Sequence, residues 1–174
     1  MSAGHPTVQI ARETLERFYN DGVIHVPDIA LPPDLPARAG AFVSLHKRDT
    51  DELRGCVGTV EPTQATLAEE IAMNALAAAL RDPRFVPVHP SELPNLRIKV
   101  DVLSPPERVA SLDDLDPRRY GVIVQQGLLR GLLLPDLPGV DDVETQVAIA
   151  MQKAGIRPGT PVDLYRFEVL RFSE

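Results

Sequence analysis

Residues 53–58 read Leu-Arg-Gly-Cys-Val-Gly and place the only cysteine of the chain between two glycines. A glycine inside an extended segment costs stability, because it has no side chain to pack and loses more backbone entropy than other residues. Two glycines this close together therefore predict an unusual backbone path or the close approach of another group. In an extended segment Arg54 and Cys56 share one face, where the guanidinium would favour the thiolate.

The segments beside this motif predict strands. Residues 41–47 alternate in side-chain character and a polar turn at 47–51 follows, so this segment and the motif together predict a hairpin. The alternation over residues 96–102 is typical of a half-buried strand. Residues 120–134 predict a second hairpin, and residues 165–169 predict a final strand packed against the core.

Three segments predict helices, namely residues 7–20, 66–81 and 143–154. The second opens with a capping box, Thr66-Leu67-Ala68-Glu69, and the third stops at Gly155. Asn74 lies within the apolar run of the second helix, where a core amide bonded to backbone is favoured over a ligand-binding role. The proline-rich residues 27–36 predict an extended segment packed over the body of the protein.

Strands in pairs with irregularly interspersed helices predict an α+β fold, with a mainly antiparallel β-sheet flanked by helices, rather than a doubly wound fold. A chain of 174 residues is long enough for one substantial core. We therefore expect a single domain over residues 1–174.

The net charge of −7 argues against a partner that is duplex nucleic acid or an anionic membrane surface. No stretch has the length of an apolar membrane span and no signal peptide is evident, which predicts a cytoplasmic protein. A single cysteine builds neither an internal disulfide nor a thiolate zinc site, and the histidines lack ligand spacing. With no phosphate loop or dinucleotide fingerprint, we predict no metal and no cofactor.

The chemistry of a cysteine side chain leaves three interpretations of Cys56. As a buried small hydrophobe it is inert. As a nucleophile it needs a base, for which His46 and His89 are the candidates, with His46 facing either Cys56 or solvent depending on the hairpin register. As part of a backbone binding surface it lies beside Gly55 and Gly58, which admit a ligand close to the main chain.

In this third interpretation Arg54 pairs with an anionic group of the ligand. Arg84, Lys99 and Arg130 could extend the pocket, although Lys99 and Arg130 taken singly read as surface charges. Arg84 is constrained by the turn at Asp82-Pro83, and a contact between Asp82 and Arg84 would be structural.

Several segments together strongly resemble the AMMECR-type domain of the AmmeMemoRadiSam system protein A family. The matching blocks cover nearly the whole chain, and they are residues 53–58, Glu61-Pro62, Asp82-Pro83-Arg84-Phe85, Val102-Leu103-Ser104-Pro105, residues 121–124, residues 130–135 and Leu164-Tyr165-Arg166-Phe167. The resemblance implies an α+β protein of two unequal lobes, with the smaller lobe within about residues 60–95 and the cysteine motif near a cleft. It also implies a Memo-like protein or a radical-SAM enzyme as partner.

The sequence thus predicts a binding or accessory component that takes a small anionic ligand or a protein partner at Arg54, Gly55, Cys56 and Gly58. The alternative is a thiol-dependent enzyme with Cys56 as nucleophile, Arg54 as stabiliser of an anion and His46 as base. A third interpretation is a structural interaction module whose motif only lets two parts of the chain pack closely.

Overall fold

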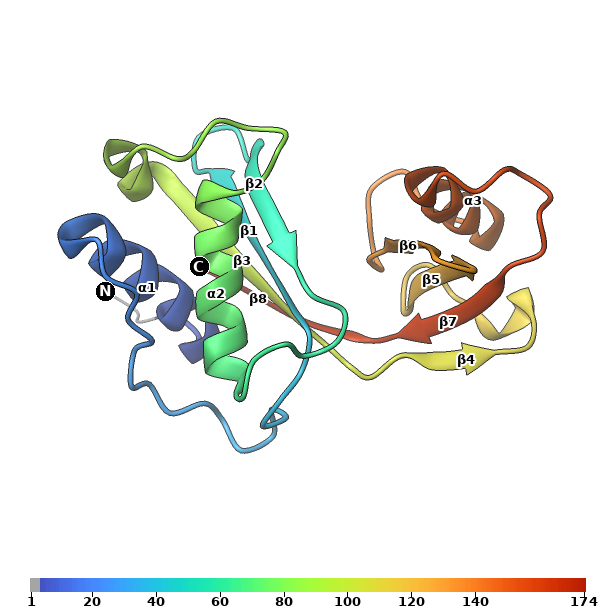
Figure 1. The fold of residues 1–174 in the computed structure, drawn as a ribbon, viewed down its shortest axis with the longest axis horizontal. Helices are drawn as coiled ribbons and strands as arrows, with labels where there is room; N and C mark the ends of the chain where they lie inside the picture. The colour runs from blue at the N-terminus through green and yellow to red at the C-terminus, as the bar shows by residue number, and fades with distance from the viewer. Residues whose placement is uncertain (1–3) are drawn as a thin grey trace. The chain divides into compact units, whose positions relative to one another are not determined.

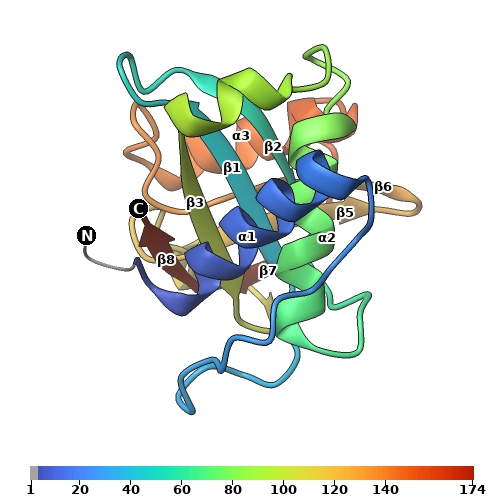
Figure 2. The same ribbon diagram turned by 90° about the vertical axis from the view of Figure 1, so that its left-hand side faces the viewer.

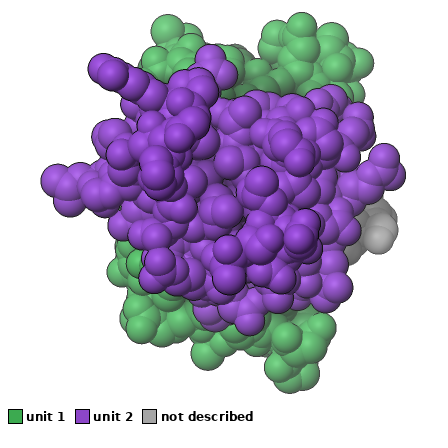
Figure 3. Space-filling model, turned by 90° about the vertical axis from the view of Figure 1, so that its right-hand side faces the viewer, with its two compact units in different colours: residues 1–102, 170–174 green, residues 103–169 purple. Residues whose placement is uncertain are grey.

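The computed structural model of the chain describes residues 4–174 and contains two compact units (Figure 1). Unit 1 takes residues 1–102 and 170–174, and unit 2 takes residues 103–169 (Figure 3). Residues 60–95, where the resemblance places a smaller lobe, lie within unit 1. Unit 2 is therefore inserted in the sequence between two parts of unit 1.

Unit 1 contains a four-stranded sheet in the order β2-β1-β3-β8. The hairpin predicted around the cysteine motif is present, because β1 (Ala41–Lys47) pairs antiparallel with β2 (Leu53–Gly58). On its other side β1 pairs antiparallel with β3 (Leu96–Leu103), and β8 (Val169–Ser173) completes the sheet. The motif strand β2 thus lies at an edge of this sheet.

Two helices, α1 (Pro6–Asp21) and α2 (Leu67–Leu80), cover one face of this sheet (Figure 2). The capping box predicted for α2 is present, with the Thr66 side chain accepting from the Glu69 N–H. The side chain of Asn74 donates to the Ala41 carbonyl at 2.9 Å, which confirms its interpretation as a core amide bonded to backbone. The helices and the sheet enclose a core that includes Ile10, Leu15, Val43, Ile71, Ile98 and Val100.

The proline-rich segment packs over this core as predicted, since Ile29, Leu31 and Leu35 contact it. A short 3-10 helix, η1 (Pro90–Asn95), then leads into β3. It follows an irregular segment, residues 81–89, that begins where α2 ends.

Unit 2 contains a second four-stranded sheet in the order β4-β7-β5-β6. Its strands are β4 (Glu107–Val109), β5 (Gly121–Gln126), β6 (Leu129–Leu133) and β7 (Asp163–Phe167), all paired antiparallel. A 3-10 helix, η2 (Leu112–Asp114), follows β4, and α3 (Val143–Ala154) packs against β5 and β6. Two antiparallel sheets with flanking helices confirm the α+β class.

The single final strand predicted over residues 165–169 is instead two strands in two sheets. The chain leaves the β7 pairing at Glu168, whose backbone N–H donates to the Ser104 hydroxyl at 2.8 Å and whose carbonyl accepts from the Ser104 N–H at 2.9 Å. Residues before Glu168 pair within unit 2, and β8 pairs within unit 1. Side-chain alternation alone does not reveal this exchange of partners, because the apolar positions Tyr165, Phe167 and Val169 continue across Glu168 without a break.

The tripeptide Leu-Arg-Gly occurs at residues 53–55 and 129–131. In both places its glycine lies directly under a helix. Gly55 lies under α2, where an added Cβ would overlap the Ala78 carbonyl oxygen. Gly131 lies under α3, where an added Cβ would overlap the Ala150 carbonyl oxygen. In each unit a glycine on an edge strand therefore lets a helix backbone approach the sheet closely.

Candidate functional site

The motif strand β2 carries a β-bulge at Arg54, between Leu53 and Gly55. Leu45 pairs with Gly55, whereas the next residue of β1, His46, pairs with Leu53, so Arg54 is an extra residue in β2. The strict alternation that predicts a shared face for Arg54 and Cys56 ends at this bulge. A bulge redirects side chains, so the spacing of the two residues along β2 no longer places them on one face.

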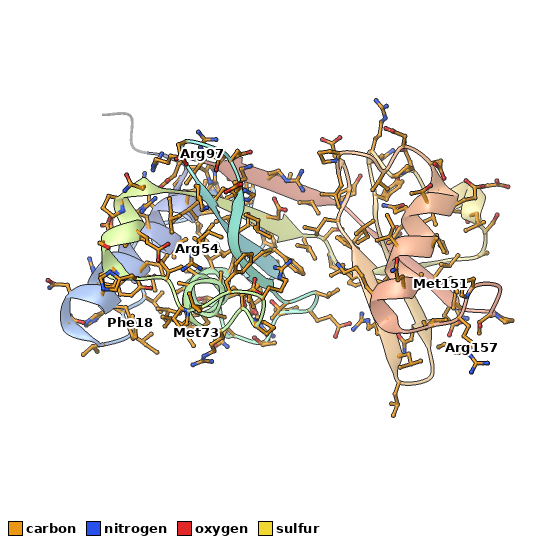
Figure 4. The ribbon with its side chains drawn as sticks, turned by 90° about the horizontal axis from the view of Figure 1, so that it is seen from above. Phe18, Arg54, Met73, Arg97, Met151 and Arg157 are labelled. Carbon is orange, nitrogen blue, oxygen red and sulfur yellow. The ribbon has the colours of Figure 1, made fainter. Side chains whose placement is uncertain are left out.

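Arg54 is a buried structural arginine. The residue is 8% exposed, and its Nε and Nη2 atoms donate to the two oxygens of Glu92 at 2.9 and 3.0 Å. Its Nη1 donates to the Val86 carbonyl at 3.0 Å. The guanidinium lowers the pKa of Glu92, so the pair stays charged and ties η1 and the segment before it to β2. Arg54 is labelled in Figure 4. An anionic ligand would have to displace Glu92 to reach Arg54.

The two glycines of the motif make room for the chain itself. Gly55 accommodates the α2 backbone at Ala78, and Gly58 lies against the ring of Phe42 on β1. An aromatic side chain across an edge-strand glycine is a common way of covering it. The close approach predicted from the glycines is therefore made by a helix and an aromatic ring.

Cys56 is partly exposed, and its backbone N–H donates to Oδ2 of Asp82 at 2.9 Å. Asp82 is buried, and Arg84 holds it through Nε at 3.0 Å and Nη2 at 2.7 Å. This bidentate contact holds the pKa of Asp82 far below its usual range. The carboxylate thus stays ionised and caps an N–H group of the edge strand.

Arg84 is the arginine whose charge reaches the thiol. Its hydrogen bonds to Asp82 raise its pKa, and the negative charge of an ionised Cys56 raises it further. Arg84 also stays accessible, because 57% of its side chain is exposed. The sequence predicts Arg54 as the residue that favours the thiolate, whereas the structure joins Arg84, through Asp82, to the backbone of Cys56.

His46 contacts Ser44, which is the cross-strand partner of Cys56. The imidazole Nδ1 lies 3.1 Å from the Asp51 carbonyl oxygen and Nε2 lies 3.1 Å from the Ser44 hydroxyl oxygen. A carbonyl only accepts, so Nδ1 carries the proton and Nε2 of the neutral ring accepts from Ser44. His46 is thereby oriented toward Ser44, the residue that pairs with Cys56 across the two strands.

The other two residues predicted to extend the pocket, Lys99 and Arg130, are not part of the cluster around Cys56. Lys99 pairs with Asp51 at 3.3 Å, and it lies on β3 opposite Ser44. Arg130 lies on β6 and is exposed in unit 2, whereas Cys56 and Arg84 belong to unit 1. The structure therefore gathers Cys56, Asp82 and Arg84, with Arg54 beside them as a support.

Three residues at the candidate site are not among the predicted site residues, namely Glu92, Phe85 and Val86. The Phe85 ring centroid lies 5.5 Å from the Arg84 guanidinium carbon and 6.0 Å from that of Arg54. Val86 is 76% exposed, and its carbonyl accepts from Nη1 of Arg54. The capping pattern at residues 89–92 is the one signal that could have identified Glu92, whose carboxylate accepts from the His89 N–H.

The AMMECR1 family model matches residues 8–172. The chain belongs to the AMMECR1 family. It is 51% identical to a Thermotoga maritima protein over 99% of each chain. The crystal structure of the uncharacterised protein PH0010 from Pyrococcus horikoshii has a TM-score of 0.87 and 33% identity, covering 98% of this chain and 91% of that one.

A longer relative also contains this AMMECR1-family sequence. A Clostridium acetobutylicum protein is 43% identical over 97% of this chain, but the match covers 36% of the relative's own length. The domain is therefore one part of a larger protein in that organism.

The described residues 4–174 lack two features that would define particular kinds of site. No helix in this part of the chain is long and apolar enough to cross a membrane. Within the same residues, no group of three or more His, Cys, Asp or Glu side chains is placed to hold a metal ion.

Proposed function

We propose that this AMMECR1-family chain is a binding or accessory component that contacts a protein partner through a motif surface formed by Cys56, Arg84, Phe85 and Val86. The observation that carries the proposal is the state of Arg84, which is fixed by a buried carboxylate and still exposes more than half of its side chain. A guanidinium held in place loses little conformational entropy when it binds.

The motif surface combines charge with apolar area. Among residues 4–174, Nη1 of Arg84 has no hydrogen-bond partner, so it remains available to a carboxylate or another anionic group. The Phe85 ring and the exposed Val86 side chain lie next to it in the sequence. Arginine and aromatic side chains are enriched in the centres of protein interfaces, which favours a protein partner over a small anion.

Two further observations support a partner from the family's own system. The Clostridium relative joins this domain to additional chain, so the domain works beside other protein segments there. The family resemblance points to a Memo-like protein or a radical-SAM enzyme, and we propose one of these as the partner. A small anionic ligand at Arg84 is the competing occupant of the same surface.

The first prediction concerns Arg84. Arg84→Ala should weaken the affinity for a Memo-like or radical-SAM partner from the same source about tenfold, which corresponds to about 1.4 kcal/mol. Biolayer interferometry with purified proteins measures this. Arg81→Ala is the matched control, because Arg81 is an exposed arginine three residues earlier and should leave the affinity unchanged.

Thermal unfolding of both variants separates binding from folding, since Arg84→Ala also removes the ion pair with Asp82. Equal losses in the two variants, or failure of both candidate partners to bind the native chain, would rule out the proposed role of Arg84. Saturable binding of inorganic phosphate that Arg84→Ala abolishes, without partner binding, would favour the small anion.

The thiol-dependent enzyme stays as the second candidate, favoured by the Ser44–His46 hydrogen bond across the strand pair from Cys56. In it the thiol proton would pass to Ser44 while Ser44 gives its own to Nε2, leaving a thiolate and an imidazolium. This route needs Arg84 rather than Arg54 as the neighbouring positive charge.

The second prediction separates the two candidates through the rate at which iodoacetamide alkylates Cys56. A cysteine that serves a binding surface and is partly shielded should react more slowly in the folded protein than in the urea-unfolded chain at the same pH. The bound partner should slow the reaction further, by about tenfold or more at saturation. Reaction faster than in the unfolded chain, lost in Ser44→Ala, would instead identify an activated nucleophile.

A further inference from the structure

The outer edge of β2 is covered in part, although no strand among residues 4–174 pairs with it. Residues 82–87, which follow α2, lie beside this edge, and we call them the β2 strap. At one end of the strap, Oδ2 of Asp82 accepts from the Cys56 N–H at 2.9 Å. Near the other end, the Val86 carbonyl accepts from Nη1 of Arg54 at 3.0 Å. The strap thus leads from α2 toward η1 while it is attached to β2 at two positions (Figure 1).

The pairing with β1 decides which backbone groups of β2 face outward. In an antiparallel pair, successive residues alternate between bonding to the neighbouring strand and facing away from it. The Thr59 N–H donates to the Ala41 carbonyl, so Thr59 bonds toward β1, whereas Cys56 and Gly58 face away. The bond from Cys56 to Asp82 agrees with this alternation. The Cys56 N–H is therefore a group that an added strand would need, and Asp82 occupies it.

Asp82 is fixed at this position by Arg84. Nε of Arg84 donates to Oδ1 at 3.0 Å, and Nη2 donates to Oδ2 at 2.7 Å. The Arg84 backbone N–H also donates to Oδ1, at 3.1 Å. Only 3% of the Asp82 side chain is exposed. A carboxylate held by several charge-assisted bonds is already ordered, so it competes well with an incoming strand for the Cys56 N–H.

The bulge at Arg54 protects the start of the same edge. A bulge interrupts the regular spacing of N–H and carbonyl groups along a strand, so a second strand does not match it. Beside the bulge, the Arg54 guanidinium holds the strap at Val86 and holds η1 at Glu92. The remaining stretch of the edge, residues 56–58, therefore depends on Asp82 for its protection.

We propose that the β2 strap, locked by Asp82 and Arg84, prevents β2 from pairing with β2 of a second copy of this chain. An edge strand with unoccupied N–H and carbonyl groups is a template for strand pairing. Two identical edge strands can pair antiparallel about a two-fold axis, where each supplies the groups that the other needs. This role is independent of the partner proposed for the motif surface, because its test uses the chain alone.

The test removes the carboxylate and measures the mass of the chain in solution. Asp82→Ala should raise the mean mass, determined by size-exclusion chromatography with light scattering, about twofold over the native chain at the same concentration, because a two-fold pair adds one copy. Asp101→Ala is the matched control. Asp101 is also a buried acid and is paired with Arg171, but it lies on β3 inside the same sheet. It should lower the thermal midpoint and leave the mass unchanged.

A second substitution shows whether strand pairing causes the association. Proline has no N–H group and is tolerated on an edge strand where that group would face outward. Adding Cys56→Pro to Asp82→Ala should therefore return the mass to that of the native chain. Asp82→Leu, whose side chain is similar in size and accepts no hydrogen bond, repeats the test should Asp82→Ala fail to fold.

Circular dichroism confirms that each variant is folded before the masses are compared. A native mass for the folded Asp82 variants would overturn the proposal. Association that Cys56→Pro does not reverse, or equal association of Asp101→Ala, would overturn it as well, because the cause would then be loss of stability rather than an exposed edge.

Discussion

Glu70→Ala should lower the free energy of unfolding by about 3–5 kcal/mol, because it removes the acceptor of a buried hydrogen-bond cluster. Glu70 is 1% exposed, and its carboxylate accepts from the Thr59 hydroxyl, from both the backbone and the hydroxyl of Thr63, and from the Gln64 N–H. These bonds fix the turn that follows β2. Without the carboxylate the donors lose their partner in a place where water does not fully replace it.

Urea denaturation monitored by circular dichroism measures this loss. Glu69→Ala is the matched control on the same helix, where the side chain closes the exposed capping box, and it should cost about 1 kcal/mol. A Glu70→Ala loss no larger than the Glu69→Ala loss would contradict the structural role assigned to Glu70.

The same carboxylate gives a pH dependence with a definite sign. Burial alone raises the pKa of Glu70, but the hydrogen bonds from Thr59, Gln64 and Thr63 outweigh it and lower the pKa below the ordinary value of 4.5. A lowered folded pKa means that the stabilisation is complete above the unfolded value and is lost as the pH falls through the folded one. The stability difference between the native chain and Glu70→Ala should therefore shrink below about pH 4.5.

Gly55→Ala should cost about 3 kcal/mol or more, or prevent folding, because the added Cβ would overlap the Ala78 carbonyl oxygen. That atom belongs to the α2 backbone and is held by the helix, so no side-chain rotation relieves the overlap. The yield of folded protein and the thermal midpoint measure the effect.

Gly58→Ala is the informative comparison, since its Cβ would overlap the Phe42 ring rather than a backbone atom. Phe42→Leu should restore part of the stability lost in Gly58→Ala, whereas no single side-chain change offers such relief to Gly55→Ala. A mild Gly55→Ala effect would mean that α2 lies farther from β2 than the structure places it.

Much of the fold follows from local signals in the sequence. The capping box at Thr66, the stop at Gly155 and the alternation over residues 96–102 each predict an element that is present. These signals succeed because a cap or an alternation is decided by a few neighbouring residues. The interpretation of Asn74 succeeds for a related reason, since an amide in an apolar helix needs a backbone partner.

The geometry of the candidate site could be predicted from the sequence only in part. The bulge at Arg54 changes the face of one residue, and it depends on the register with β1, which local spacing does not encode. The contact between Cys56 and Asp82 joins residues 26 positions apart and exists only once α2 has packed against β2. Both segments belong to the blocks that carry the family resemblance, but only the three-dimensional structure shows that Asp82 joins Arg84 to Cys56.

The insertion of unit 2 between two parts of unit 1 determines the order in which a growing chain can be completed. Residues 103–168 leave the ribosome before β8, although β8 belongs to the sheet that the earlier residues begin. Glu174 then bonds to Arg12 across a sequence separation of 162 residues and to Arg48 across 126. The unit that starts second during synthesis can therefore finish first, while the sheet containing Cys56 waits for its fourth strand.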